Sequence, residues 1–335
     1  MDELVSIIIP AYNAERWVGE TIRSALSQTW PRKEIVIVDD GSTDETLAIA
    51  RRYESKLVKV VTQKNSGVSA ARNRGLTFAQ GSYIQWLDAD DLLAPDKISH
   101  QLKSAERGKD SRTLLTSSFG TFYFCRERAK VSPSVLWQDL SPVEWLLNKF
   151  NDNLWMNPAT WLVSRKLTEL SGPWNERLVR DNDGEYICRV VAASENIRFV
   201  REAMSYYRTC NFGSLSNSWS EKAQESLGQS LGLCTGYLLA LENSERTRRA
   251  CVNYLQSFMP FFYPEGEGVL HKVQALASQL GGQLTVPQVS WKRALLSRII
   301  GSKTTKKVMI RCAKTKFKAV IQLDRLLCGM LHEAH

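Results

Sequence analysis

The stretch Ser82-Tyr83-Ile84-Gln85-Trp86-Leu87-Asp88-Ala89-Asp90-Asp91 predicts an apolar strand that ends in a cluster of carboxylates. Because side chains alternate along an extended chain, Asp88 and Asp90 are expected to point the same way. Carboxylates this close repel each other unless a cation or a proton lies between them. Proteins usually bind Mg²⁺ or Mn²⁺ with one or two carboxylates and substrate phosphates. The stretch therefore favours a metal-bridged phosphate ester or nucleotide over a solvated acidic loop.

Two earlier strands are also predicted to end in polar residues. Residues 34–38 form an apolar run that ends in Asp39-Asp40-Gly41-Ser42-Thr43-Asp44. The first strand, over residues 4–9, is followed by Pro10-Ala11-Tyr12-Asn13.

Helical patterns separate these strands. Asn13 is the expected N-cap of a first helix, whose apolar stripe consists of Val18, Ile22, Ala25 and Leu26. Residues 42–45 have capping-box spacing and predict a second helix over residues 43–53. A third strand is expected over residues 57–62 and a third helix over residues 68–78. This alternation predicts a parallel sheet with helices on both faces, whose strand ends meet at one edge and form a ligand site there.

The sequence around this edge excludes two common nucleotide sites. No Gly-x-Gly-x-x-Gly run follows the first strand, and no Gly-Lys-Ser/Thr sequence of a P-loop occurs. Phosphate charge would then be neutralised by a metal and by basic side chains. Arg72 in the third predicted helix can bind phosphate oxygens with its forked guanidinium, although an ordinary surface arginine is the alternative.

The motifs together resemble those of the family-2 inverting glycosyltransferases. The resemblance rests on Val5 to Asn13, Ile37 to Asp44, Asn65 to Asn73 and Leu87 to Asp91, which occur in the family's order and spacing. It is close over residues 4–105 and looser to about residue 210. The resemblance implies an α/β fold of the GT-A type, an αβα sandwich with a mostly parallel central sheet.

The resemblance also implies roles for single residues. Pro10, Ala11 and Tyr12 would line the base pocket, and Asp40 would accept a hydrogen bond from a base N–H, which favours uracil or thymine. The other residues implied to bind the nucleotide-sugar are Asp39, Arg72, Asp88, Ala89 and Asp90. Asp90 would coordinate Mn²⁺ or Mg²⁺, supported by Asp91. A metal across the diphosphate stabilises the charge of the leaving group.

The catalytic base is predicted farther along, in Arg180-Asp181-Asn182-Asp183-Gly184-Glu185. An apolar helical pattern follows this run, so its carboxylates lie at a helix N-terminus, where the helix dipole favours the ionised form. In the family the base is the Asp of a Glu-Asp pair at such a helix start, which implies Asp183, although this chain has Asn182 in place of the Glu. Asp181 and Glu185 stay open as alternatives, as does a purely helix-capping role for all three carboxylates.

Two features narrow the class further. The chain lacks the Gln-x-x-Arg-Trp sequence of the family's processive synthases, which favours the transfer of one sugar at a time. Tyr206-Tyr207-Arg208 followed by Ser214-Leu215-Ser216 resembles a segment that closes over the diphosphate in relatives. A plain surface cation is the alternative for Arg208.

The C-terminal part differs in composition. Residues 221–281 have helical patterns, interrupted by expected breaks at Pro260 and Pro264 and at Gly281-Gly282. Beyond them, basic and apolar residues alternate and carry most of the formal net charge of +9. We expect a catalytic, nucleotide-sugar-binding domain over residues 1–215, a helical extension over 216–282 and a basic amphipathic segment over 283–335.

The basic segment has two main interpretations. A basic amphipathic helix often lies on an anionic membrane surface, and the alternative is a helix that packs on the catalytic domain. Nucleic acid is not an expected partner. The N-terminus has no signal-peptide pattern and the seven cysteines have no CxxC spacing, so we expect a cytoplasmic protein, peripheral on the inner face of the membrane if the first interpretation holds.

The leading hypothesis is a metal-dependent glycosyltransferase that takes a sugar from a UDP- or dTDP-linked donor to a glycan or lipid-linked acceptor. One alternative is a phosphohydrolase in which Asp88 becomes phosphorylated. In such enzymes the Asp-x-Asp motif follows the first strand, whereas here it follows the fourth. The other alternative is a nucleotide-binding protein without turnover.

Overall fold

The computed structural model describes residues 3–106, 111–209, 220–262 and 267–285, with residues 301, 304, 305, 308, 311, 315 and 320–328. Its strands are β1 (Val5–Ala11), β2 (Lys33–Asp39), β3 (Val58–Thr62), β4 (Tyr83–Trp86), β5 (Leu92–Leu93), β6 (Thr113–Phe122), β7 (Lys130–Val131), β8 (Leu162–Ser164) and β9 (Asn196–Arg208). Its α-helices are α1 (Val18–Leu26), α2 (Thr46–Arg51), α3 (Val68–Phe78), α4 (Lys97–Glu106), α5 (Pro142–Asn151), α6 (Arg165–Ser171), α7 (Asn182–Ala193), α8 (Glu221–Leu241), α9 (Glu245–Phe262) and α10 (Glu267–Gln279). Two short 3₁₀ helices are η1 (Arg126–Arg128) and η2 (Pro158–Thr160).

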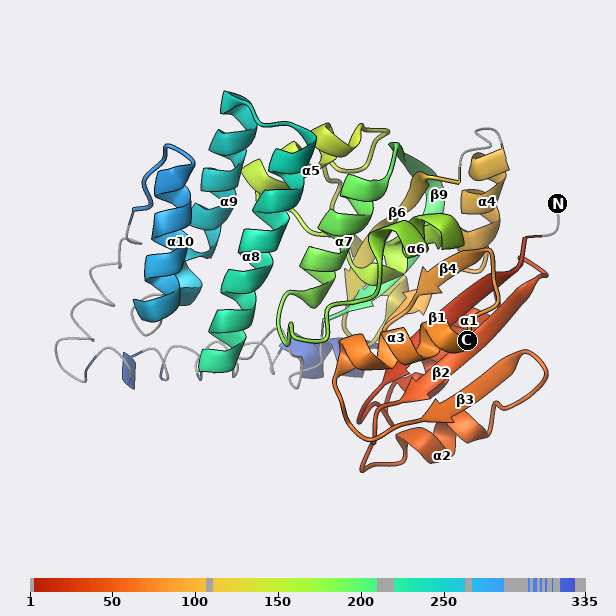
Figure 1. Cartoon of the computed structure of the whole chain (residues 1–335). Coiled ribbons are helices and arrows are strands. Elements are labelled where there is room, and N and C mark those ends of the chain that lie inside the picture. The colour runs from red at the N-terminus through yellow and green to blue at the C-terminus, as the bar shows by residue number, and fades with distance from the viewer. Residues whose placement is uncertain are drawn as a thin grey trace.

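One sheet forms the centre of the described chain, in the strand order β3-β2-β1-β4-β8-β6-β9-β5, with β7 beside β6 (Figure 1). The strands β3, β2, β1 and β4 are parallel neighbours, and β6 and β9 also pair in parallel. The antiparallel strand β8 joins the two groups and leaves β6 running in the direction of β4. The predicted, mostly parallel sheet is confirmed.

Alternation along β1 creates a core on each face of the sheet. Val5, Ile7 and Ile9 point into a cluster that includes side chains of α1 and α4. Ile8 points the other way, into a larger cluster that contains side chains of α5, α7, α8, α9 and α10. Since both faces are covered, nearly the whole strand is apolar, as expected for a buried parallel strand. The predicted αβα sandwich is therefore confirmed.

Two predicted helix starts were wrong. Asn13 has a positive φ of 47°, and its side-chain oxygen accepts from the Thr43 N–H, so it joins two loops instead of capping α1. The helix α2 begins at Thr46 because Asp44 accepts hydrogen bonds from both the N–H and the hydroxyl of Thr46. The capping-box spacing at Ser42 thus marks a loop, and the loop places polar groups at the carboxyl end of β2.

The helices α8, α9 and α10 lie side by side next to α7, away from β1, β2 and β3 (Figure 1). Their buried side chains join the same core cluster as Trp86 at the end of β4. The helix α9 continues through Pro260, where we expected a break, and ends at Phe262; the second expected break, Pro264, lies outside the described residues. Met259 and Phe262 are fully buried, and their burial keeps this last turn helical although Pro260 lacks an N–H. The division at residue 215 stays a prediction, since packing joins its two sides.

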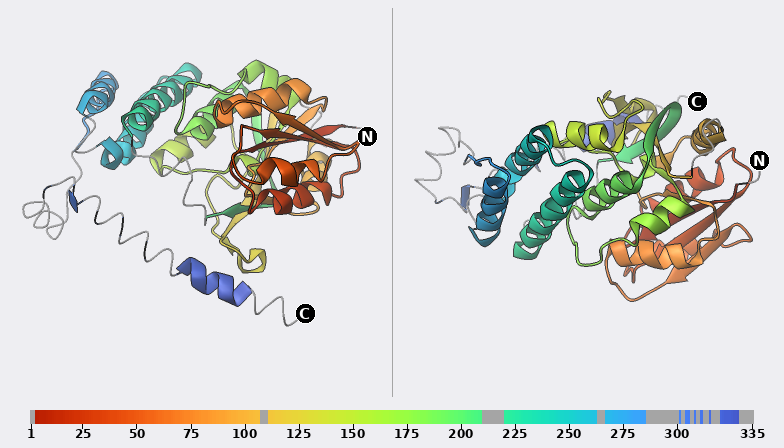
Figure 2. Two further views of the ribbon diagram at one scale, coloured as in Figure 1. Left: turned by 90° about the horizontal axis from the view of Figure 1, so that it is seen from below. Right: turned by 45° about the horizontal axis from the view of Figure 1, so that its top comes forward.

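Most of the basic segment lies outside the described residues, but residues 320–328 are helical and lie near the loop at residues 124–128 (Figure 2). Asp324 accepts from the main-chain N–H of Phe124 at 3.0 Å and from Arg128 at 3.0 Å. Ile321 is buried, whereas Val320, Leu323 and Leu326 are exposed. In the part of the chain that the structure describes, no helix is both long and apolar enough to span a bilayer.

Candidate active site

A cavity of about 630 Å³ lies at the carboxyl ends of β1, β2 and β4. The end of β1, the loops after β1, β2 and β3, the helix α3 and the loop after β4 contribute Pro10, Ala11, Tyr12, Ala14, Asp40, Asn65, Gly67, Val68, Ala71, Arg72, Asp88, Ala89 and Asp90. Later parts of the chain contribute Trp155, Asn157, Pro158, Val179, Arg180, Asp181, Asn182, Asp183, Tyr207, Leu227 and Phe258. The predicted site residues therefore surround one cavity, with the exception of Asp39. The volume is within the usual range of small-molecule sites.

Asp40 fixes the loop after β3 and still faces the cavity. One of its carboxylate oxygens accepts from Gln63 and from the Ser66 N–H, and the other accepts from the Gly67 N–H. A carboxylate offers about four lone-pair positions, so one acceptor position is left for a ligand. Asp39 is buried and accepts from the Ser42 N–H. Tyr12 is 51% exposed at the rim, as a side chain that packs on a planar ligand would be.

Arg72 lies beneath the cavity and is not the surface arginine of the alternative interpretation. Only 3% of it is exposed, its Nη2 donates to Asp88 Oδ1 at 2.6 Å, and its guanidinium lies 4.0 Å from the ring centre of Trp174. Its Nε and Nη1 are buried without a partner among the described residues. Two N–H donors held in place at a cavity wall suit phosphate oxygens.

Arg208, at the end of β9, binds and stabilises the acidic run that follows β4. Its main-chain N–H donates to Asp91 at 2.9 Å, and its Nε donates to the Asp90 carbonyl at 2.8 Å. Its Nη2 forms an ion pair with Glu20 at 2.6 Å, and only 3% of the residue is exposed, so the surface-cation alternative was wrong. Burial, and then the charges of Asp90 and Asp88, raise the pKa of Asp91. Of the predicted closing segment, Ser214-Leu215-Ser216 lies outside the described residues.

The two predicted acidic centres converge at the cavity, because Asp88 and Asp90 at the end of β4 line it together with Asp183 at the start of α7, almost a hundred residues later. Tyr207 lines the same cavity. Burial raises the pKa of Tyr207, and the charges of Asp91, Asp90, Asp183 and Asp88 raise it further.

The donor set at this place consists of oxygen atoms, which suit Mg²⁺ or Mn²⁺. Within the described ranges, no group of three His, Cys, Asp or Glu residues is arranged to hold an ion by itself. Asp90 and Asp88 can therefore contribute only part of a coordination shell, and phosphate oxygens of a ligand would have to complete it. The residues fit an ion shared with a diphosphate, and the metal itself stays a prediction.

The start of α7 holds Asp183 at the cavity, as its place before an apolar helix predicts. Asp181 precedes the helix in the left-handed conformation, with φ at 56°, and its carboxylate accepts from Ser230 on α8 at 2.6 Å. Ser226, also on α8, accepts from the Arg180 N–H and donates to the Arg180 carbonyl. Burial and the charge of Asp183 raise the pKa of Asp181 to about 6. The helix α8 therefore holds the loop that carries Asp183.

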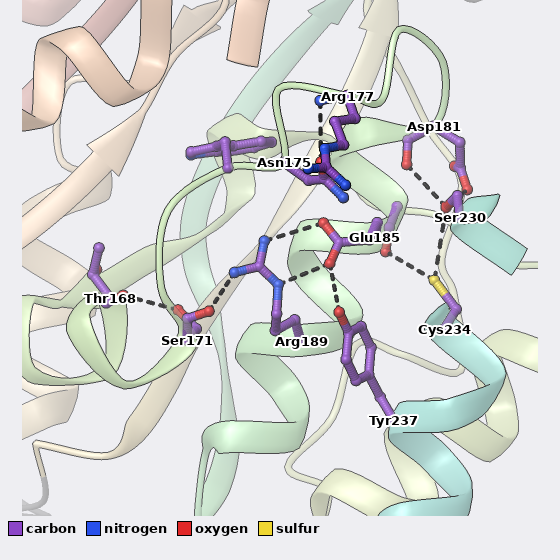
Figure 3. Close-up of polar contacts among 12 residues, drawn as sticks. Thr168, Ser171, Asn175, Arg177, Asp181, Glu185, Arg189, Ser230, Cys234 and Tyr237 are labelled. Atoms are coloured by element: carbon purple, nitrogen blue, oxygen red, sulfur yellow. Dashed lines mark hydrogen bonds and ion pairs between the residues drawn. The ribbon is translucent and has the colours of Figure 1, made fainter. Parts of the chain in front are cut away.

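Glu185, one of the alternative bases, is fully engaged inside the protein (Figure 3). It is 1% exposed, forms an ion pair with Arg189 at 2.8 Å and accepts from the Tyr237 hydroxyl at 2.7 Å. Arg189 also donates to the Ser171 carbonyl, so the network joins α6, α7 and α8. Glu185 does not line the cavity, and the structure gives it a structural role.

The sequence analysis missed the wall at residues 155–158, where Trp155 and Asn157 line the cavity. The Asn-Pro dipeptide at 157–158 signals a turn, and an aromatic residue shortly before it was the available clue. Leu227 and Phe258 could not be assigned, because their spacing is that of ordinary apolar helix positions.

Comparisons with known proteins agree with this geometry. Residues 6–134 match the model of the family described as glycosyl transferase family 2. An uncharacterized glycosyltransferase of Haemophilus influenzae is 41% identical over 125 residues, which are 36% of this chain and 48% of that protein. TuaG of Bacillus subtilis, a glycosyltransferase named for teichuronic acid biosynthesis, is 44% identical over 103 residues, 30% of this chain and 41% of its own. The chain thus spans less than half the length of these relatives.

Longer matches are more distant. GlyG, a glycosyltransferase of Streptococcus pneumoniae, is 27% identical over 255 residues, covering 70% of this chain and 81% of that protein. The crystal structure of S. aureus TarS 1–349 in complex with UDP superposes with a TM-score of 0.62 at 18% identity, over 83% of this chain and 82% of TarS 1–349. The complex of TarS 1–349 with UDP-GlcNAc gives a TM-score of 0.58, also at 18% identity, over 83% and 89% of the two chains. These structural matches establish the fold.

Proposed function

We propose that this chain, whose residues 6–134 belong to glycosyl transferase family 2, moves one sugar from a UDP- or dTDP-linked donor to an acceptor hydroxyl with inversion. The observation that carries the proposal is the single cavity that contains Asp40, Arg72, Asp90 and Asp183. The nucleoside would lie at Tyr12 and Asp40, and the diphosphate at Arg72. The two unpaired N–H groups of Arg72 support this placement.

In the proposed reaction, Asp183 takes the proton of the acceptor hydroxyl. The hydroxyl oxygen forms a bond to the anomeric carbon as the bond from that carbon to the diphosphate oxygen breaks, and the electron pair leaves with the nucleoside diphosphate. Attack opposite to the leaving group inverts the anomeric centre. General-base catalysis of this kind contributes about 10²–10⁴-fold to rate. The position of Asp183 in the first turn of α7 supports an ionised carboxylate.

We also propose a dependence on Mn²⁺ or Mg²⁺. Asp90, with Asp88 beside it, would hold the ion together with the donor's diphosphate. Once bound, the ion would supply positive charge next to the leaving phosphate oxygens. Arg72 contributes the protein's own positive charge there, and its ion pair with Asp88 keeps that guanidinium in place.

For the acceptor, we propose a cell-envelope glycan or its lipid-linked precursor. The support is the naming of TuaG for teichuronic acid biosynthesis, together with the basic C-terminal segment. Val320, Leu323 and Leu326 give that segment an exposed apolar side, which supports contact with an anionic membrane surface. The full chain should then pellet with vesicles that contain anionic lipid at low salt, and should stay in the supernatant with neutral vesicles.

The first test of the function is the melting temperature with UDP, dTDP, GDP and CMP, each with and without Mn²⁺. A ligand at a hundred times its Kd stabilises the fold by about 2.7 kcal/mol, which gives a readable shift. We expect a manganese-dependent rise with UDP or dTDP, followed by slow release of UDP or dTDP from the matching sugar nucleotides. The absence of a shift with every nucleotide would contradict the proposal.

A further inference from the structure

Asn157 occupies an unusual position in the wall of the cavity. It is the N-cap residue of η2, and its main-chain carbonyl accepts from the N–H of Thr160 at 3.0 Å and from the Thr160 hydroxyl at 2.7 Å. Asparagine is common at this position because its side-chain oxygen usually accepts an N–H of the helix. Here the side chain makes no such bond. The amide is therefore turned away from the turn that it precedes.

Both side-chain polar atoms of Asn157 are left without a partner in the described part of the chain, although only 1% of the residue is exposed. Buried polar groups are nearly always hydrogen-bonded, because an unpaired one loses its contacts with water and gains nothing. An amide that lines a cavity with one free acceptor and two free donor hydrogens is arranged to bind what enters that cavity.

The surroundings of Asn157 indicate the kind of ligand. Trp155, two residues earlier, is 49% exposed, and its ring centre lies 5.1 Å from that of Tyr207 and 5.1 Å from that of Phe119. A large aromatic ring held in place beside an amide suits a sugar, whose ring offers an apolar C–H face and hydroxyl edges.

The location of this wall relative to the charged residues indicates which part of the substrate reaches it. Trp155 packs on Tyr207, and both line the same cavity as Asp90 and Asp183. Tyr12 and Asp40, at the nucleoside side, come from the loops after β1 and β2. The wall at Trp155 and Asn157 thus belongs to the side of the cavity where bonds are exchanged.

We propose that Asn157 binds two neighbouring hydroxyls of a sugar ring, one as donor and one as acceptor, while Trp155 supports the ring. This inference rests on the proposed function and adds the group that selects the sugar. The diol can belong to the transferred sugar or to the acceptor sugar, and the experiment has one arm for each.

The donor arm compares binding of UDP with binding of UDP-glucose and UDP-galactose by titration calorimetry with Mn²⁺, using the full chain and its Asn157→Ala variant. If the diol is on the donor, the better UDP-hexose should bind the variant at least about tenfold more weakly, whereas UDP should bind unchanged. The matched control is Asn65→Ala, an asparagine at the nucleoside side of the same cavity. Its effect should be equal for UDP and for the UDP-hexose.

The acceptor arm measures binding of methyl glucoside and methyl galactoside to the UDP-bound protein by saturation-transfer NMR. If the diol is on the acceptor, the signal should disappear in Asn157→Ala while the donor affinities stay unchanged. The unliganded variant should melt at the same temperature as the parent or higher, because the amide caps nothing. Asn157→Ser provides a second variant should the alanine variant fold poorly.

Three results would overturn the inference. Unchanged binding in both arms would mean that ordered water satisfies the amide. Equal weakening of UDP and UDP-hexose binding would mean that the substitution disturbs the whole cavity. A parent protein that binds neither UDP nor dTDP, and no hexose linked to either nucleotide, would overturn the proposed function itself, and the inference with it, which separates the two failures.

Discussion

The sheet edge at β1, β2 and β4 and the helix pair α7–α8 meet at one cavity, but they treat their polar groups differently. At the sheet edge, Arg72 keeps two buried N–H groups without a partner among the described residues. At the helix pair, Asp181 is bonded to Ser230, and Glu185 is bonded to both Arg189 and Tyr237. The first region keeps hydrogen-bonding capacity for a ligand, whereas the second uses it to fix the loop before Asp183. The arrangement of the sheet edge therefore suits the binding of a ligand, and that of the helix pair suits the positioning of Asp183.

The largest expected effect is at Asp183, where the comparison predicts loss of turnover without loss of binding. Asp183→Asn should lower the rate of sugar transfer by about 10²–10⁴-fold and leave the affinity for UDP with Mn²⁺ unchanged. Asp90→Ala should instead weaken the binding of UDP, and the affinity that remains should no longer depend on Mn²⁺. The exposed carboxylate Asp152, changed to Asn, is the control. Full activity of Asp183→Asn would transfer the role of base to Asp181.

The second prediction tests the hydrogen-bond donors of Arg72 that have no partner among the described residues. Arg72→Ala should weaken UDP binding by about 10- to 100-fold, since hydrogen bonds to charged groups contribute about 1.5–3 kcal/mol, and should change uridine binding little. Arg74 lies on the same helix but is exposed, so Arg74→Ala is the matched control. Titration calorimetry with both ligands measures the difference. An equal loss for uridine would show that Arg72 supports the fold instead of binding phosphate.

The third prediction concerns the pH dependence of stability at the helix pair. The pKa of Asp181 is about 6 in the folded protein, against an ordinary value of 3.8, so folding favours its protonated form. Its contribution to the stability of the fold is present below pH 4 and is lost as the pH rises through 6. Asp181→Asn cannot ionise, and it should gain up to about 3 kcal/mol over the parent at pH 7.5 and nothing at pH 4. Denaturant unfolding at the two pH values measures this, and a gain independent of pH would refute it.

The last prediction concerns a steric clash at Gly184. An added Cβ there would stand 2.2 Å from Asp181 Oδ1, so Gly184→Ala forces the Asp181 side chain to move. We expect a loss of about 1–3 kcal/mol in stability, as for other overpacked sites. Asp181→Gly removes the clash and tolerates the positive φ, so the double variant should lose less than the sum of the two single variants. Additive losses would show that Gly184 and Asp181 do not interact.

The two regions also differ in how far the sequence predicts them. The end of β4 and the helix α3 were predicted because their signals are local: an apolar run that stops at Asp88, and apolar spacing from Val68 to Phe78. The positions of Asp90 and Asp40 at one edge follow from the parallel topology alone.

The start of α2, the end of α9 and the support of the Asp183 loop depend on contacts that local sequence patterns do not predict. The hydrogen bond that the Thr46 N–H donates to Asp44 makes α2 begin later than predicted, and the buried neighbours of Pro260 keep α9 helical through that residue. The support of the Asp183 loop by Ser226 and Ser230 joins residues about fifty positions apart. Serines at that spacing look like ordinary helix residues until the tertiary structure brings the loop against them.

Leu227 and Phe258 reach the cavity from α8 and α9, beyond the residues 6–134 that match the family model. Substitutions on those two helices can reshape one wall while the loops after β1, β2 and β4 keep their geometry. A lineage can therefore keep the loops after β1, β2 and β4 and diversify the opposite wall of the cavity independently. For protein engineering, the same separation makes Leu227 and Phe258 the positions at which this wall of the cavity can be varied.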